Sequence, residues 1–95
     1  MTASDTDKQL VQRAQRGDLR AFDLLVLKYQ GRIAALISRY VSDAGEVEDV
    51  TQEAFIKAFR ALGKFRGESA FYTWLYRIAA NAAKNHLVAK GRRPG

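Results

Sequence analysis

Residues 65–87 read FRGESAFYTWLYRIAANAAKNHL, and this stretch joins a loop to a long helical pattern. Ser69 is expected to cap the helix, which runs to about Lys90, and Gly91 with Pro94 is expected to close it. At about 100° per residue, four apolar side chains fall within one narrow arc: Phe71, Leu75, Ile78 and Ala82. The stretch therefore predicts a helix that packs one face on a core.

A second arc of the same helix combines an aromatic ring with polar and basic side chains. It spans roughly 80° by helical geometry and consists of Trp74, Arg77, Asn81 and Lys84. Arg and Asn are shaped to hydrogen-bond base edges, Lys meets phosphate, and Trp offers a flat face to a base. The helix contains no Asp or Glu, as a surface that faces an anion requires. Core packing accounts for Phe71 and partly for Tyr72 and Tyr76, but it accounts poorly for this arc as a set.

Two helices are expected before residue 41. Thr6 followed by Gln9 resembles a capping box, and Gly17 ends the helix that follows. Asp18 can cap the next helix, because a short side-chain acceptor satisfies free backbone N–H groups. That helix runs roughly from Leu19 to Tyr40, and its apolar side chains recur at steps of three and four: Phe22, Leu25, Val26, Tyr29, Ile33, Leu36, Ile37 and Tyr40.

A third helix is expected from Asp43, which forms a capping-box pattern with Glu46, to about Leu62. Its expected inward face consists of Val47, Val50, Ala54, Ala58 and Ala61. Gly63–Glu68 then break the helical pattern. Little strand signal is present, and 95 residues fit one small domain. The predicted fold class is all-α, a compact bundle of about four helices.

Composition argues against several classes of function. The chain has no Cys and a single His, His86, so neither a disulfide framework nor a thiolate metal site is expected. No Gly-rich phosphate loop is present, and no nucleophile accompanies the carboxylates. We therefore expect no catalytic residue, no metal and no cofactor, in a protein that is not an enzyme. No hydrophobic run reaches spanning length and no signal-peptide pattern opens the chain, which favours a soluble, cytoplasmic protein.

Charge is divided between two parts of the chain. The net charge of +6 and the pI near 10.0 indicate a polyanionic partner. Residues 42–56 contain five acidic side chains and no Lys or Arg, whereas residues 57–95 contain nine Lys or Arg and one acid, Glu68. This division predicts two surfaces with two different partners, although charge scattered for solubility is the ordinary alternative.

Several acidic and amide residues of the third helix lie on one side of it. Asp49, Gln52, Glu53 and Ile56 share that side, and Phe55 lies roughly 100° to 200° around the helix from it. An acidic and amide surface with apolar neighbours suits a protein partner that carries Arg. A merely solvated helix face has the same spacing, so both interpretations stay open on spacing alone.

The loop GKFRGES, residues 63–69, precedes the basic and aromatic helix. It carries Lys64, Phe65 and Arg66, and Gly67 permits a tight backbone turn. Aromatic rings beside cations suit an unpaired nucleic-acid strand, because bases stack on the rings while the cations follow the phosphates. A loop that grips a single strand, next to a helix that reads a duplex, predicts a protein that works at a fork in DNA.

At this point the residues resemble a known family. The run DVTQEAFIKAFRALGKFRGESAFYTWLYRIAANAAKNHLVAKGRRP resembles region 2 of bacterial extracytoplasmic-function RNA polymerase sigma factors, most of all the stress-response sigma-E type. The run LVQRAQRGDLRAFDLLVLKYQGRIAALISRYV resembles the opening helices of the same family, so the resemblance covers nearly the whole chain. It implies that residues 1–91 are the region 2 domain. Residues 92–95 would begin the interdomain linker, with the region 4 domain absent.

The resemblance implies a role for the acidic side of the third helix. In the family, the DVxQE segment docks on the coiled coil of the clamp in the largest subunit of core RNA polymerase. The positions of this chain that match it are Asp49, Gln52 and Glu53, with Phe55 nearby. The resemblance thus favours the protein-binding interpretation of this face over the solvated one.

The resemblance also implies roles for the loop and the fourth helix. In the family they recognise and melt the −10 element of promoter DNA, and a flipped non-template base enters a pocket formed by the loop. Binding of that base offsets unpairing, which costs a few kcal/mol. The loop matches are Phe65, Arg66, Gly67, Glu68 and Ser69, with Lys64 in the same loop and Lys57 and Ala61 before it on the third helix. The helix matches are Trp74, Arg77, Asn81 and Lys84, and Phe71, Tyr72 and Tyr76 supply further rings.

The implied function is to direct transcription initiation at stress-response genes, without ATP or a small-molecule substrate. A membrane-anchored anti-sigma factor is a further partner that the resemblance implies. Two alternatives come from other classes. The first is a helix-turn-helix-like regulator that binds duplex DNA without melting it, although no short two-helix unit or dimer face is clear. The second is a protein-only adaptor, for which the basic half would be incidental.

Overall fold

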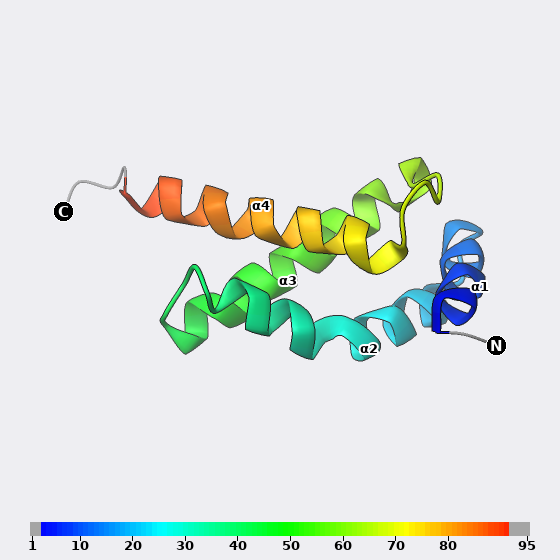
Figure 1. Cartoon of the computed structure of the whole chain (residues 1–95), viewed down its shortest axis with the longest axis horizontal. Helices are drawn as coiled ribbons and strands as arrows, with labels where there is room; N and C mark the ends of the chain where they lie inside the picture. The colour runs from blue at the N-terminus through cyan, green and yellow to red at the C-terminus, as the bar shows by residue number, and fades with distance from the viewer. Residues whose placement is uncertain (1–2, 92–95) are drawn as a thin grey trace.

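The computed structural model describes residues 3–91, with side chains from residue 6 onward, and every regular element in that range is helical. The helices are α1 (Ala3–Gln15), α2 (Leu19–Ile37), α3 (Ala44–Ala61) and α4 (Phe71–Gly91), with a 3₁₀ turn, η1 (Leu62–Lys64), after α3. Figure 1 shows α2, α3 and α4 side by side, with α1 across the end at which α2 begins and the loop after η1 turns into α4. The predicted all-α bundle of four helices is confirmed.

The start of α2 forms as the sequence predicts. The Asp18 carboxylate accepts hydrogen bonds from the backbone N–H groups of Arg20 (3.1 Å) and Ala21 (3.4 Å). It also accepts two from the Arg13 guanidinium, at 2.9 and 2.7 Å, and this hydrogen bonding lowers the pKa of Asp18. Gly17 has φ +100°, a left-handed conformation that glycine adopts without steric cost. The turn between α1 and α2 is therefore fixed at both of its helix ends.

Two predicted helix boundaries at α1 and α2 are wrong. Because α1 begins at Ala3, Thr6 lies inside the helix and is not its cap. Helix α2 ends at Ile37 and not at Tyr40, since the N–H of Tyr40 bonds the carbonyl of Ile37 three residues back, in the tighter 3₁₀ manner. The apolar stripe predicted for α2 is otherwise confirmed, with Val26 and Tyr40 half-buried at its edges.

Two further predicted caps are corrected on α3 and α4. Asp43 caps α3 by accepting from the N–H of Glu46 at 2.9 Å, but the Glu46 carboxylate does not complete the box. It accepts instead from Lys90 (3.0 Å) and pairs with His86 (3.2 Å) on α4, and these two contacts lower the pKa of Glu46. The Ser69 hydroxyl donates to the carbonyl of Ala70, and α4 begins at Phe71, so Ser69 lies before the cap position. Helix α4 includes Gly91, and Pro94 lies outside the described residues.

The core lies between α2, α3 and α4, and Leu10, Val11 and Ala14 of α1 extend it at one end. Its largest fully buried side chains are Leu25, Ile33, Ile37, Val50 and Leu75. Alanines on α3 and α4 are also fully buried, which lets the helix backbones approach closely, since Ala adds little volume at a crossing. The expected inward face of α4 is confirmed except that Ile78 is half-buried. On α3, Val47 and Ala61 are only half-buried, and Phe55 takes a core position in their place.

One buried carboxylate ties α1 to α2. Asp7 is 6% exposed and accepts hydrogen bonds from the Tyr29 hydroxyl and from Lys28 Nζ, the latter at 2.6 Å. Burial and the hydrogen bond to Asp7 raise the pKa of Tyr29. Because an unsatisfied buried acceptor is costly, this network specifies where α1 crosses the bundle.

We therefore expect Tyr29→Phe to lower the free energy of unfolding by about 1–3 kcal/mol, because the Asp7 carboxylate loses a buried donor. Urea denaturation followed by circular dichroism measures the change. Tyr40→Phe is the matched control, since Tyr40 is half-buried and no side-chain hydrogen bond is found for it among the described residues. Equal losses for the two variants would contradict this role of Asp7.

Candidate nucleic-acid and protein interfaces

The loop of residues 65–70 is held at its base by α1. Gln15 Nε2 donates to the carbonyl of Leu62 (3.0 Å) and to the carbonyl of Phe65 (2.9 Å). The N–H of Phe65 in turn bonds the carbonyl of Leu62 at 3.1 Å. One side chain of α1 thus bonds two carbonyls at the base of the loop, that of Leu62 in η1 and that of Phe65. Sequence reasoning missed Gln15, whose partners lie 47 and 50 positions away.

An aromatic cluster fixes the other side of the loop. The ring centroid of Phe65 lies 4.9 Å from that of Trp74 and 6.1 Å from that of Phe71, and Phe71 and Trp74 are 5.8 Å apart. Phe71 is buried, whereas Phe65 and Trp74 are half-buried and keep part of each ring at the surface. The rings therefore both anchor the loop and offer a surface on which a base can stack.

A pocket of about 380 Å³ opens between this loop and α4, and we name it the loop–α4 pocket. Its lining consists of Lys64, Phe65, Arg66, Glu68, Ser69, Trp74 and Arg77. All seven belong to the site that the sequence predicts for DNA. Three of them are cations, and none of these three makes an ion pair within residues 3–91. The pocket thus combines ring faces with unpaired positive charge.

The outer face of α4 continues away from this pocket. Arg77, Asn81 and Lys84 are all exposed, and α4 carries no acidic side chain. Trp74 belongs with the loop more than with this row, because its ring packs on Phe65. The structure thus divides the predicted arc into a ring at the loop and a polar, basic row beyond it.

A second group of rings lies between α4 and α2. Tyr72 stacks on Tyr29 with centroids 5.0 Å apart, and the Arg32 guanidinium lies 5.7 Å from the Tyr72 ring. Tyr76 meets Tyr72 edge-on and is 38% exposed. Sequence reasoning missed Arg32, although an exposed cation one turn from the buried Tyr29 was a usable signal. Cation and rings here stabilise one another and hold the start of α4.

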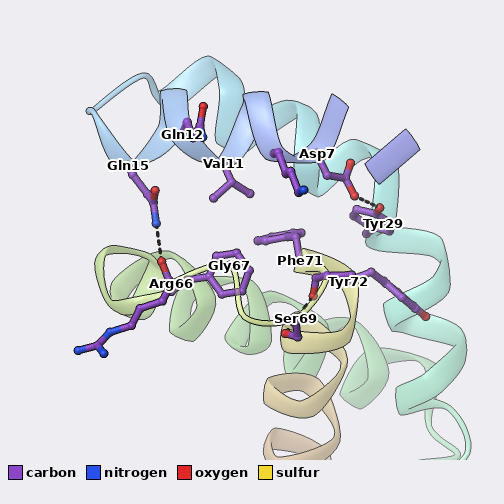
Figure 2. A pocket seen from close by; sticks show the side chains of 13 residues that line it. Asp7, Val11, Gln12, Gln15, Tyr29, Arg66, Gly67, Ser69, Phe71 and Tyr72 are labelled. Carbon is purple, nitrogen blue, oxygen red and sulfur yellow. Dashed lines mark hydrogen bonds between the residues drawn. The ribbon is translucent and has the colours of Figure 1, made fainter. Parts of the chain in front are cut away.

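A second pocket, of about 420 Å³, lies between α1 and the same loop, and we name it the α1–loop pocket. Figure 2 shows Val11 pointing into it from α1, with Phe71 and Tyr72 on the opposite side. Lys57 and Ala61 line neither pocket: Lys57 pairs with Glu53 at 3.4 Å, and Ala61 is half-buried on α3. Lys57 and Ala61 thus lie on α3 outside both pockets, as Tyr76, Asn81 and Lys84 lie outside them on α4.

The acidic face of α3 lies apart from both pockets. Asp49, Gln52 and Glu53 are exposed, whereas Phe55 is 7% exposed and packs in the core beneath them. Two apolar side chains on α3 remain exposed, Ile56 at 51% and Phe59 at 45%. Sequence reasoning missed Phe59, whose ring packs edge-on against Phe22 at 5.0 Å. The face thus presents carboxylates and an amide on the helix that also carries two exposed apolar groups.

No three His, Asp or Glu side chains within residues 3–91 gather as ligands for a metal ion. None of the helices in the same range has the length and apolar character to cross a bilayer.

Comparisons with known proteins agree with the motifs. Residues 25–93 match the family described as Sigma-70 region 2. The RNA polymerase sigma-H factor of Pseudomonas aeruginosa is 72% identical over 94 residues, and the ECF RNA polymerase sigma-E factor of Escherichia coli K12 is 65% identical over 94. Both alignments cover 99% of this chain and 49% of the relative, so the chain spans about half the length of the curated relatives it matches.

Two solved structures share the fold. An engineered region 2 of sigmaE, solved by NMR in complex with GTAAAA, superposes with a TM-score of 0.88 at 59% identity, covering 98% of this chain and 97% of the other. CnrH, solved in complex with the cytosolic domain of CnrY, superposes with a TM-score of 0.79 at 31% identity, covering 84% and 52%. The resemblance drawn from the sequence motifs is thus confirmed, and the chain belongs to the Sigma-70 region 2 family.

Proposed function

We propose that this chain is the promoter-recognition module of a bacterial sigma factor, which docks on core RNA polymerase and recognises and melts the −10 element. The observation that carries the proposal is the loop–α4 pocket, where ring faces and unpaired cations meet beside a helix without acidic groups. The neighbouring structure of sigmaE region 2 in complex with GTAAAA supports it. The action is binding alone, in the cytoplasm, without a cofactor, ATP or a small-molecule substrate.

Strand opening in this proposal uses the two halves of the site together. The loop–α4 pocket holds one flipped base of the non-template strand, which stacks on the exposed parts of Phe65 and Trp74. Arg77, Asn81 and Lys84 meet the duplex edge and its phosphates beyond the fork. Because the rings and the loop are already packed in the free chain, capture of the base requires little further ordering of the protein.

The acidic face of α3 is the proposed contact with the clamp coiled coil of the largest polymerase subunit. Asp49, Gln52 and Glu53 would meet basic groups of the coiled coil, and Ile56 would add apolar contact. Phe55, buried below, would support this face without touching the partner. Charge of opposite sign on the α4 side keeps the polymerase and DNA surfaces distinct.

Two further parts of the proposal concern regulation and domain organisation. CnrH is seen in complex with the cytosolic domain of CnrY, which supports a membrane-anchored anti-sigma factor as a partner of this chain. Residues 1–91 form the region 2 domain in this proposal, and residues 92–95 begin an interdomain linker. The relatives named sigma-H and sigma-E support a role at stress-response promoters.

The alternative is a regulator that binds duplex DNA without opening it. Such a protein would bind duplex at least as tightly as a fork of the same sequence, and it would not distinguish bases in a single strand. Binding to duplex, single-stranded and forked DNA, each titrated with salt, separates the two functions.

For the polymerase face, we expect the double variant Asp49→Lys, Glu53→Lys to lose most of its capture by core polymerase, because both carboxylates would be replaced by like charges facing a basic partner. Pull-down with core enzyme measures the loss, and circular dichroism checks the fold. Glu48→Lys is the matched control, since Glu48 is exposed on α3 about 100° around the helix. Undiminished capture by a folded double variant would refute this contact.

For the DNA face, we expect one position of the −10 strand to be read in single-stranded DNA as well as in duplex. A wrong base there should weaken binding about ten- to a hundred-fold, since stacking and edge contacts are worth roughly 1–3 kcal/mol. Competition binding with each base substituted in turn, in the presence of core polymerase, gives the profile.

Two variants should act differently on that profile. Glu68→Gln alters the loop–α4 pocket and should change the preference at that one position. Lys84→Ala should weaken binding to all sequences alike. It should also make the negative slope of log affinity against log salt shallower by about 1. A flat profile that neither variant alters would show that the loop reads no base.

A further inference from the structure

The loop of residues 65–70 has a pocket on each side. Phe65, Arg66 and Ser69 line both the loop–α4 pocket and the α1–loop pocket, so the loop is a wall between them. At about 420 Å³, the α1–loop pocket lies within the range of small-ligand sites, roughly 300–1,000 Å³. The proposed function uses one of these pockets and leaves the other without a role.

The inner wall of the α1–loop pocket consists of rings that are held in place. Phe65, Phe71 and Tyr72 contribute to it, and Tyr72 is fixed by stacking on Tyr29 at 5.0 Å. Figure 2 shows Val11 facing Phe71 from α1. Fixed rings opposite an aliphatic side chain form a slot that suits a flat aromatic ligand, because the ligand can stack without ordering the wall.

Several polar groups around this slot already have partners, and others do not. Asp7 is taken by Tyr29 and Lys28, and the Gln15 amide nitrogen by two backbone carbonyls. Lys8 and Gln12 are exposed on α1, and neither side chain has a hydrogen bond or ion pair among the described residues. An amide that both donates and accepts, beside a free ammonium group, fits a nucleobase edge and its phosphate.

The loop has open space around Gly67. Gly67 has φ +76°, and a Cβ added there would meet nothing within 4 Å, so glycine is needed for its backbone angle and not for packing. Arg66 lines both pockets, and Figure 2 shows its guanidinium extending away from the cavity. A nucleic-acid backbone that passes over the loop would have Arg66, which lines both pockets, as its nearest cation in the segment 65–70.

We propose that the α1–loop pocket binds a second unstacked base of the same strand, next to the base held in the loop–α4 pocket. The loop then separates two neighbouring bases, and Arg66 meets the phosphate between them. This inference rests on the proposed function, because a strand must already reach the loop. It assigns α1 a direct part in DNA binding, through Gln12 and Lys8.

The test fills the α1–loop pocket with a large side chain and measures at which nucleotide position removal of the base no longer weakens binding. Gln12→Trp places a large ring at the pocket from an exposed position of α1, and Gln30→Trp makes the same change at an exposed position of α2 that lines neither pocket. The probes are single-stranded oligonucleotides of the preferred −10 sequence, with an abasic site at each position in turn. They are bound to the chain with core polymerase, and binding to core polymerase alone is subtracted.

We expect two adjacent abasic positions to weaken binding of the unsubstituted chain, each about ten-fold or more. Gln12→Trp should weaken binding of the intact strand about ten-fold and abolish the abasic penalty at only one of these positions, whereas Gln30→Trp should keep both. The α1–loop pocket would not bind a base if Gln12→Trp still lost affinity at both abasic positions, or if the unsubstituted chain lost affinity at only one. Either result would leave the proposed function standing. No penalty at any position would overturn the proposed function as well.

Discussion

The two hydrogen bonds from Gln15 to the carbonyls of Leu62 and Phe65 are the constraint on which the candidate DNA site depends. A loop that follows a helix end has open carbonyls and would otherwise sample many conformations. Here α1 closes it from one side and the ring of Trp74 closes it from the other. The two pockets lie on either side of this loop, which is held between α1 and α4.

The placement of α1 has two causes, which are its apolar side chains in the core and the buried carboxylate of Asp7. Its bonds to Tyr29 and Lys28 fix α1 on α2, and Tyr29 stacks on Tyr72 at the start of α4. One chain of contacts therefore runs from the buried Asp7 side chain to the rings beside the candidate DNA site. The acidic face of α3 lies outside this chain of contacts, so the proposed polymerase contact does not depend on the packing that holds the candidate DNA site.

The helices and the two charged faces could be predicted from local pattern, because helical spacing and caps such as Asp18 act over a few residues. Local pattern failed where a partner on another element decided the outcome. Glu46 bonds α4 and leaves its capping box incomplete. Phe55 turned inward because the α3 surface it occupies faces the core. Gln15 and the α1–loop pocket were out of reach, since they join segments about half the chain apart.

The central claim is that Gln15 holds the loop in place before DNA binds. Its most direct test is base discrimination by the Gln15→Glu variant, which keeps the shape of the side chain but removes both hydrogen-bond donors. Gln30→Glu is the matched control, an exposed Gln on α2 that receives the same charge. Competition binding to −10 strands that differ at the position read by the loop gives the answer. We predict that Gln15→Glu stays helical and loses most of this discrimination, whereas Gln30→Glu keeps it. Unchanged discrimination in a folded Gln15→Glu variant would show that the candidate DNA site does not depend on the Gln15 hydrogen bonds.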